Sequence, residues 1–217
     1  MIVFRRSELR LSHFESSVCR NSDNIRAIAT YLSLAFKITW AVFIAVWIIG
    51  AFTAKRAVRR QSLPSRIGMV AIAIAAYYIL FGAAEYFGFA YRRFLPDLEI
   101  YLWIGLLMTI AGVAFAIWAR LTLGRNWSGT VTIKQDHELI RTGPYALVRH
   151  PIYTGIALAV LGTAIFDGKI RSLILILATF SVLIYKIRME EQFMTEQFGS
   201  EYTNYRQKTK ALVPFLW

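Results

Sequence analysis

The sequence predicts an all-α integral membrane protein with five hydrophobic helices. Of its 217 residues, 57% are hydrophobic and 18% are charged, and the mean hydropathy is +0.47. A typical soluble domain is about 45–50% apolar and about 25% charged. The apolar residues also gather in runs long enough to cross a bilayer, with basic loops between them. These observations exclude a disordered chain and an ordinary soluble domain.

Three of the apolar runs are predicted to be full membrane spans. Thr30–Phe52 has 23 residues, which corresponds to about 34 Å of α-helix. Ile67–Ala90 and Leu98–Trp118 are of similar length. The hydrocarbon core of a bilayer is about 30 Å thick, so each run is long enough to cross it.

The last two apolar runs are predicted to form a short helical hairpin. Ile152–Phe166 has only 15 residues, about 22 Å of helix, which barely spans a bilayer. It is separated from Ile170–Ile187 by a polar turn at residues 167–169. The second helix is expected to continue beyond the membrane to Phe198, where Gly199 provides a C-cap.

The positions of the basic residues predict the topology. The net charge is +12, and the loop Thr53–Arg66 contains Lys or Arg at five positions and no acid. This is the pattern of a cytoplasmic loop. Residues 119–151 and the tail after Ile187 then share the cytoplasmic side, and the N-terminus lies outside. A nucleic-acid protein is disfavoured because the basic residues lie between membrane spans instead of on one soluble face.

The chain divides into three predicted regions. Residues 1–29 are a polar N-terminal segment, which lacks the apolar stretch of a cleavable signal sequence. Residues 30–118 contain the three spans. Residues 119–217 contain the loop before the hairpin, the hairpin itself and the C-terminal tail. In that loop, residues 130–133 and 138–141 flank a polar centre, which predicts a small β-hairpin or an extended loop. Pro151 is expected in the first turn of the following helix.

Polar and aromatic residues cluster on both sides of the hairpin. From the residues alone, two other interpretations stay open: an interfacial belt of Tyr and Arg, and a solvated helix face for the paired glutamates. The chain has a single cysteine, Cys19, so it cannot form a Cys-based metal cluster, and no metal site is predicted. The clustered motifs are Gly143-Pro144-Tyr145, Arg149-His150-Pro151-Ile152-Tyr153 and Glu190-Glu191.

Together with Phe198-Gly199-x-Glu201-Tyr202-x-x-Tyr205 and Pro214, these motifs resemble the C-terminal signature of a known family. It is that of the isoprenylcysteine carboxyl methyltransferases and the related phospholipid N-methyltransferases. The resemblance covers roughly residues 119–214, and four motifs follow one another in the family's order and spacing around a helical hairpin. The first hundred residues match only in being membrane spans.

The resemblance implies an enzyme that binds S-adenosylmethionine on the cytoplasmic side and methylates a lipidic substrate from the bilayer, with an isoprenylcysteine-like carboxylate favoured. Residues 119–217 are the implied catalytic region, and Arg149, His150 and Glu190 are the implied catalytic residues. Arg149 and His150 can hold a carboxylate, while Glu190 or Glu191 can hold the cofactor's ammonium group or a ribose hydroxyl. The full set of implied cofactor-binding residues is His137, Leu139, Gly143, Pro144, Tyr145, Arg149, His150, Tyr153, Glu190 and Glu191.

Several alternatives remain. A carboxylate acceptor needs no general base, whereas the ammonium group of a phospholipid must first lose a proton, for which His150 or a glutamate is the candidate. Membrane sterol reductases that use NADPH share an Arg-His-x-x-Tyr region but usually have Asn before the Tyr and lack the paired glutamates. A non-catalytic membrane scaffold is the third possibility. The oligomeric state cannot be read from the sequence.

Overall fold

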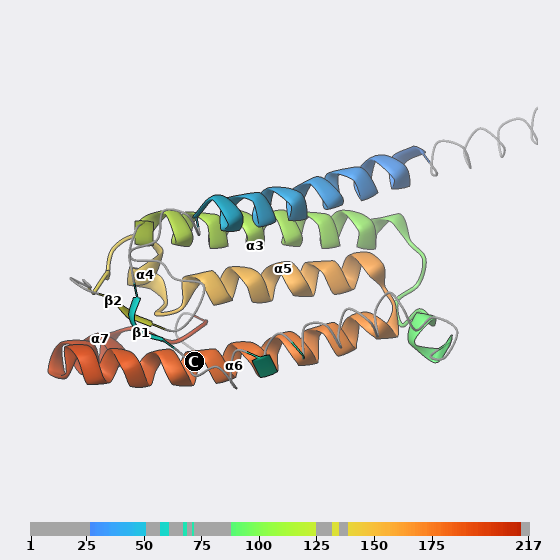
Figure 1. Cartoon of the computed structure of the whole chain (residues 1–217). Helices are drawn as coiled ribbons and strands as arrows, with labels where there is room; N and C mark the ends of the chain where they lie inside the picture. The colour runs from blue at the N-terminus through green and yellow to red at the C-terminus, as the bar shows by residue number, and fades with distance from the viewer. Residues whose placement is uncertain are drawn as a thin grey trace, which may run out of the picture.

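The computed structural model describes residues 27–50, 57–60, 67, 68, 71, 88–124, 132–134 and 139–213. The longest helices lie side by side along one axis; the two strands and two of the short helices, α4 and α7, gather at one end of them, and the short helix η2 lies at the other end (Figure 1). After a first helix at Ala27–Gly50, the elements are β1 (Ala57–Arg60), η2 (Gly88–Tyr91), α3 (Glu99–Leu123), β2 (Thr132–Lys134), α4 (Pro144–Leu147), α5 (Pro151–Asp167), α6 (Ile170–Phe198) and α7 (Ser200–Lys208).

Three of these helices are long and apolar enough to cross a membrane: Ala27–Gly50, α3 and α6. α5 is apolar but has only 17 residues. The all-α membrane class, the first and third predicted spans and the helical hairpin are therefore confirmed. The expectation that both hairpin helices are short is wrong for α6, which is long enough to cross a membrane. Most of the second predicted span, Ile67–Ala90, and most of the N-terminal segment lie outside the described residues.

α3 and α5 pack backbone against backbone through glycines. A Cβ atom added to Gly112 on α3 would lie 2.4 Å from the nitrogen of Ala159 and 2.5 Å from the carbonyl oxygen of Gly155 on α5. One added to Gly105 would lie 2.5 Å from the nitrogen of Phe166. Helices in lipid associate mainly by such close packing, because the bilayer removes the hydrophobic driving force between them. This contact fixes α5, and with it the residues at its N-terminus.

The first helix packs against α5 as well. The rings of Phe36 and Phe166 stack with their centroids 4.4 Å apart. The indole Nε1 of Trp40 donates a hydrogen bond of 3.2 Å to the hydroxyl of Thr163. α5 therefore has the first helix and α3 as neighbours, which explains how a helix with 17 residues is held in an apolar bundle.

The polar turn between α5 and α6 forms as predicted. Gly168 is in the left-handed conformation with φ 62°, and its N–H donates to the carbonyl of Ala164. The carboxylate of Asp167 accepts hydrogen bonds from Arg171 (2.6 and 2.8 Å) and from Ser172 (2.7 Å). Pro151 occupies the first turn of α5, and Gly199 ends α6, both as expected from the sequence.

The predicted start of the loop after the third span is wrong. α3 continues beyond Trp118 to Leu123, and Arg120 on this extension is buried within the fold. Its guanidinium donates to the carbonyl oxygens of Gly124 (2.9 Å) and Gly50 (2.8 Å). Carbonyls at helix C-termini lack intrahelical partners and carry partial negative charge, so the arginine extends α3 and joins it to the end of the first helix.

Of the two structures predicted for residues 130–141, a small β-hairpin or an extended loop, the hairpin is wrong. β2 pairs antiparallel with β1, with Ala57 opposite Lys134 and Arg60 opposite Thr132, while residues 139–141 have no regular structure. The strands β1, after the first helix, and β2, after α3, thus meet at one end of the molecule. This is compatible with the prediction that both loops lie on the same side of the membrane. The same end holds α4 and α7 (Figure 1).

Candidate functional site

The unequal lengths of α5 and α6 create a polar corner at this end. α6 has 29 residues and α5 has 17, so the last turns of α6 extend past Pro151, where α5 begins. Glu190 and Glu191 lie on this extension and face the residues that precede and open α5. The two predicted groups of site residues, about forty positions apart in the chain, therefore converge.

Arg149 is held by Glu191 and by the tail. Its Nε and Nη2 atoms donate to the same oxygen, Oε1 of Glu191, over 2.9 and 2.7 Å. Its Nη1 atom donates to the carbonyl oxygens of Arg206 (3.2 Å) and Thr209. The side chains of Arg149 and Glu191 are only 9% and 12% exposed, and Arg206 places a second guanidinium 3.5 Å from the other oxygen of Glu191. A buried pair of this kind is costly to break because either partner alone would be an unpaired charge.

His150 lies between the two glutamates. Its Nδ1 is 3.4 Å from Oε2 of Glu190, and its Nε2 is 3.4 Å from Oε1 of Glu191. Burial by itself lowers the pKa of His150, but the hydrogen bonds and charges of Glu190 and Glu191 outweigh burial and raise this pKa above its usual value. The imidazole is thereby favoured in its charged form, in which both nitrogens donate.

Tyr153 completes the polar corner. Its hydroxyl donates to Oε1 of Glu190, and its ring stacks on the His150 imidazole at 5.6 Å and 11°. Tyr153 follows His150 by three positions, which places both on one face at the start of α5. Glu190 is thus bonded through both of its oxygens, to Tyr153 and to His150.

The tail forms one wall of the corner. The backbone N–H groups of Arg149 and His150 donate to the carbonyls of Lys210 (2.8 Å) and Ala211 (3.0 Å), and the hydroxyl of Thr154 donates to the carbonyl of Leu212 (2.7 Å). Arg206, Thr209 and Thr154 were not predicted from the sequence. Most of these contacts use backbone atoms, which every residue type has, so the sequence does not mark the positions that make them. The predicted end of the tail, Pro214, lies outside the described residues.

Tyr205 of α7 links this wall to α4. Its hydroxyl donates to the carbonyl oxygen of Tyr145 over 2.6 Å, and burial raises the pKa of Tyr205 to about 12. The phenol therefore stays protonated at physiological pH and remains a hydrogen-bond donor.

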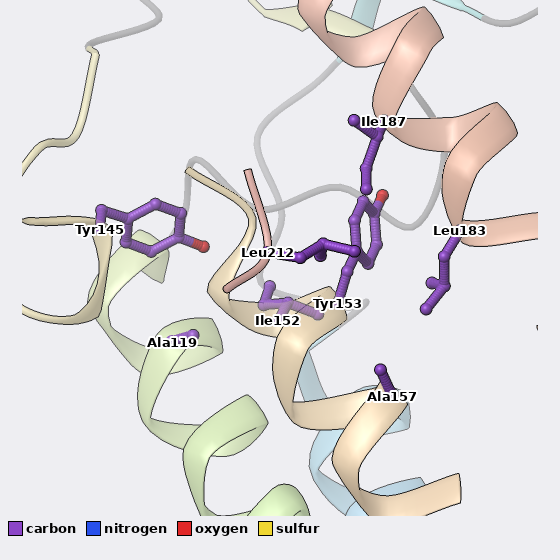
Figure 2. Packing of buried hydrophobic residues seen from close by; sticks show 8 residues of the cluster. All are labelled: Ala119, Tyr145, Ile152, Tyr153, Ala157, Leu183, Ile187 and Leu212. Atoms are coloured by element: carbon purple, nitrogen blue, oxygen red, sulfur yellow. The ribbon is translucent and has the colours of Figure 1, made fainter. Parts of the chain in front are cut away.

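An apolar cluster lies against the polar corner. It joins α3, α4, α5, α6 and the tail, and Figure 2 shows Leu212 of the tail beside Tyr153 and Ile152. Such a wall keeps water away from the polar groups and strengthens the electrostatic interactions between them. Its buried members are Ala119, Tyr145, Ile152, Tyr153, Ala157, Leu183, Ile187 and Leu212.

The remaining predicted residues lie at different distances from the corner. Pro144 and Tyr145 are buried at the start of α4. Gly143 precedes them with φ 59°, a conformation that favours glycine. Leu139 is half-buried in the irregular segment before α4, and His137 lies outside the described residues.

Comparison with known proteins shows that the chain is similar to membrane methyltransferases. A family model described as phospholipid methyltransferase matches residues 100–201. Protein-S-isoprenylcysteine O-methyltransferase B of Arabidopsis thaliana is 28% identical over 161 residues, which are 70% of this chain and 81% of that protein. The Saccharomyces cerevisiae protein-S-isoprenylcysteine O-methyltransferase is 32% identical over 133 residues, 56% of each chain.

A solved structure agrees with these matches. It is that of a eukaryotic intramembrane Ras methyltransferase, isoprenylcysteine carboxyl methyltransferase, with a TM-score of 0.51 and 25% identity over 72% of this chain and 54% of that one. The chain therefore resembles this family of membrane methyltransferases in sequence and in fold. It spans about half the length of the yeast family member and of the solved one. The polar corner falls largely within the matched residues, and its wall of residues 206–212 lies beyond the family-model match.

Proposed function

We propose that the protein transfers a methyl group from S-adenosylmethionine to the carboxylate of an isoprenylcysteine-like lipid. The observation that carries this proposal is the buried corner in which Arg149, His150 and Tyr153 meet Glu190 and Glu191 at the polar end of an apolar hairpin. The isoprenylcysteine methyltransferases with which the chain aligns support the choice of acceptor.

The residues of the corner fit the cofactor's chemistry. Glu190 can accept from an ammonium group in addition to Tyr153 and His150, because each carboxylate oxygen has two lone pairs. Arg149 keeps a second N–H on Nη2, beyond the one that bonds to Glu191, with which it can donate to a carboxylate. When bound, the cofactor supplies a methyl group on a positively charged sulfur; a new C–O bond forms at the acceptor oxygen as the C–S bond breaks, leaving a methyl ester and a neutral thioether.

The chain's own contribution is alignment and exclusion of water. Tyr153 presents an aromatic face of the kind that attracts cations, and Glu190 fixes this ring through the phenol hydroxyl. The tail residues that bond to Arg149, His150 and Thr154 pack against the corner and form one of its walls.

The state of His150 favours a carboxylate acceptor over an amine. Its pKa is raised by Glu190 and Glu191, so its neutral, proton-accepting form is less populated than that of a free histidine. A carboxylate is already a nucleophile and needs no base, whereas an ammonium headgroup must first be deprotonated. The second candidate is N-methylation of a phospholipid, because the matching family model is described as phospholipid methyltransferase.

We also propose that the corner faces the cytoplasm and that the N-terminus lies outside. The acid-free basic loop pairs through β1 with β2 at the same end as the corner, and basic loops are retained in the cytoplasm. With Cys19 replaced by Ser, a single cysteine at Ser200 should resist an impermeant thiol reagent in intact cells. One at Asp97, an 82% exposed side chain near the opposite end, should react. Labelling of the Ser200 position from outside contradicts the proposed orientation.

A transfer assay tests the activity. Purified protein in lipid nanodiscs is incubated with S-adenosylmethionine carrying a radiolabelled methyl group and with amine-blocked S-farnesylcysteine or phosphatidylethanolamine. We expect a base-labile methyl ester on the farnesylated acid, loss of this product with Glu190→Gln, and retention with Glu201→Gln, which changes an exposed glutamate. Label in the phospholipid alone supports the second candidate, and label in neither contradicts both.

A further inference from the structure

Lys186 is a charged residue of α6 that the proposed cofactor site does not use. It precedes Glu190 by four positions, one turn of helix, and so lies on the same face of α6. Its side chain is half-buried, and its ammonium nitrogen is 5.7 Å from the centre of the Tyr153 ring. Lys186 therefore borders the polar corner instead of pointing into water.

The position of Lys186 along α6 puts it between the lipid and the corner. From Ser172 to Tyr185 the helix carries no charged residue, and Lys186 lies about 24 Å along the helix from Ile170. Glu190 follows about 6 Å further on. A lipid whose chain lies along the apolar part of α6 thus brings its polar head to Lys186 before it reaches Glu190.

The charge of Lys186 acts on the carboxylate of Glu190, but the two groups lie beyond ion-pair distance. Both oxygens of Glu190 are bonded elsewhere, to Tyr153 and His150. Within the described part of the chain, Lys186 makes no ion pair. Around the corner, three cations, Arg149, Arg206 and Lys186, lie near two carboxylates, those of Glu190 and Glu191. The corner therefore has positive charge in excess, which suits an anion.

We propose that Lys186 binds the carboxylate of the lipid acceptor and makes the site select an anionic acceptor over one with an ammonium headgroup. This inference rests on the proposed function. An ammonium on a flexible stem makes charge-assisted hydrogen bonds to a carboxylate. Methylation turns the carboxylate into a neutral ester, so the same contact is lost in the product and product release is favoured.

A matched pair of variants tests this role. Lys186→Met keeps the length and apolar character of the side chain but removes the charge. Arg188→Met is the control, because Arg188 is an exposed cation two positions further along α6, about 200° around the helix. For each variant in nanodiscs, we would measure the Kd of amine-blocked S-farnesylcysteine and of its carboxamide, the KM of the acid, and the Kd of S-adenosylmethionine.

The wild type should bind the acid about tenfold to a hundredfold more tightly than the carboxamide, as expected for hydrogen bonds to a charged group. Lys186→Met should abolish the preference for the acid and raise the KM of the acid by a similar factor, while the Kd of S-adenosylmethionine stays unchanged. Arg188→Met should keep the preference. Lys186→Arg, which retains a positive charge, should show most of the preference of the wild type. An unchanged preference in Lys186→Met overturns the inference. An equal loss of cofactor binding also overturns it, because Lys186 would then belong to the cofactor site. If the wild type binds no S-adenosylmethionine, the proposed function itself fails.

Discussion

Arg149 and Glu191, 42 positions apart in the chain, are joined by two hydrogen bonds to one carboxylate oxygen, from Nε over 2.9 Å and from Nη2 over 2.7 Å. The pair couples the start of α5 to the end of α6. Since the remaining nitrogen of the guanidinium donates to the tail carbonyls of Arg206 and Thr209, one side chain joins three segments of the site.

Replacement of Arg149 by Lys should therefore be harmful although it preserves the charge. A lysine ammonium cannot reproduce the planar fork that reaches Glu191 and the tail at once. Breaking a buried pair costs about 3–5 kcal/mol when one partner is removed, and because Lys retains the charge we expect a loss of about 2 kcal/mol in stability. Thermal unfolding in detergent measures this loss.

Arg141→Lys is the control for that substitution. Arg141 pairs with Glu201 over 2.8 Å, but the two side chains are 48% and 50% exposed. Exposed pairs contribute about 0–1 kcal/mol, so the melting temperature should barely change. Equal effects of the two substitutions would show that the Arg149 pair has no special structural role.

Stability should depend on pH through His150. Because the glutamates raise the pKa of His150 in the folded state, the stabilisation that its charged form provides is present below the unfolded pKa of about 6.5. This contribution is lost as the pH rises through the folded-state pKa. The free energy of unfolding should therefore fall across this range in the wild type, and the fall should be smaller in His150→Gln. An identical pH profile for the two proteins would contradict the contacts with Glu190 and Glu191.

The contact between α3 and α5 should tolerate no added side chain. Gly112→Val would place atoms within 2.4 Å of the Ala159 backbone, so the helices must separate. Overpacking of this kind costs about 1–3 kcal/mol or more, and the separation should also reduce cofactor binding by displacing Arg149 and His150. Gly88→Val is a suitable control, since a Cβ atom there meets nothing within 4 Å. Normal melting of Gly112→Val would contradict the close packing.

The parts of the fold that depend on local signals were predictable from the sequence. Gly168 and Gly199 marked helix ends and Pro151 marked a helix start, because backbone conformation at these positions is restricted by the residue itself. The convergence of Arg149 and His150 with Glu190 and Glu191 was also predictable, since a short hairpin must bring its two open ends together.

The parts that depend on distant contacts were not predictable. A charge at Arg120 normally indicates the end of a span, but hydrogen bonds to the carbonyls of Gly50 and Gly124 stabilise the buried guanidinium. β2 resembles one arm of a local hairpin, yet its partner is β1, more than seventy positions earlier. The backbone carbonyls of the tail that bind Arg149 carry no signal in residue type.

Calorimetric titration of S-adenosylmethionine into the purified protein tests the central claim most directly. The wild type should bind the cofactor. Glu190→Gln removes the negative charge but keeps the volume of the side chain. This substitution should weaken cofactor binding by about 1.5–3 kcal/mol, the value of a hydrogen bond to a charged group. Glu201→Gln, at an exposed glutamate, should bind as the wild type does. Binding of NADPH without any response to S-adenosylmethionine, or equal affinity of the wild type and Glu190→Gln, would contradict the assignment of the buried corner as the cofactor site.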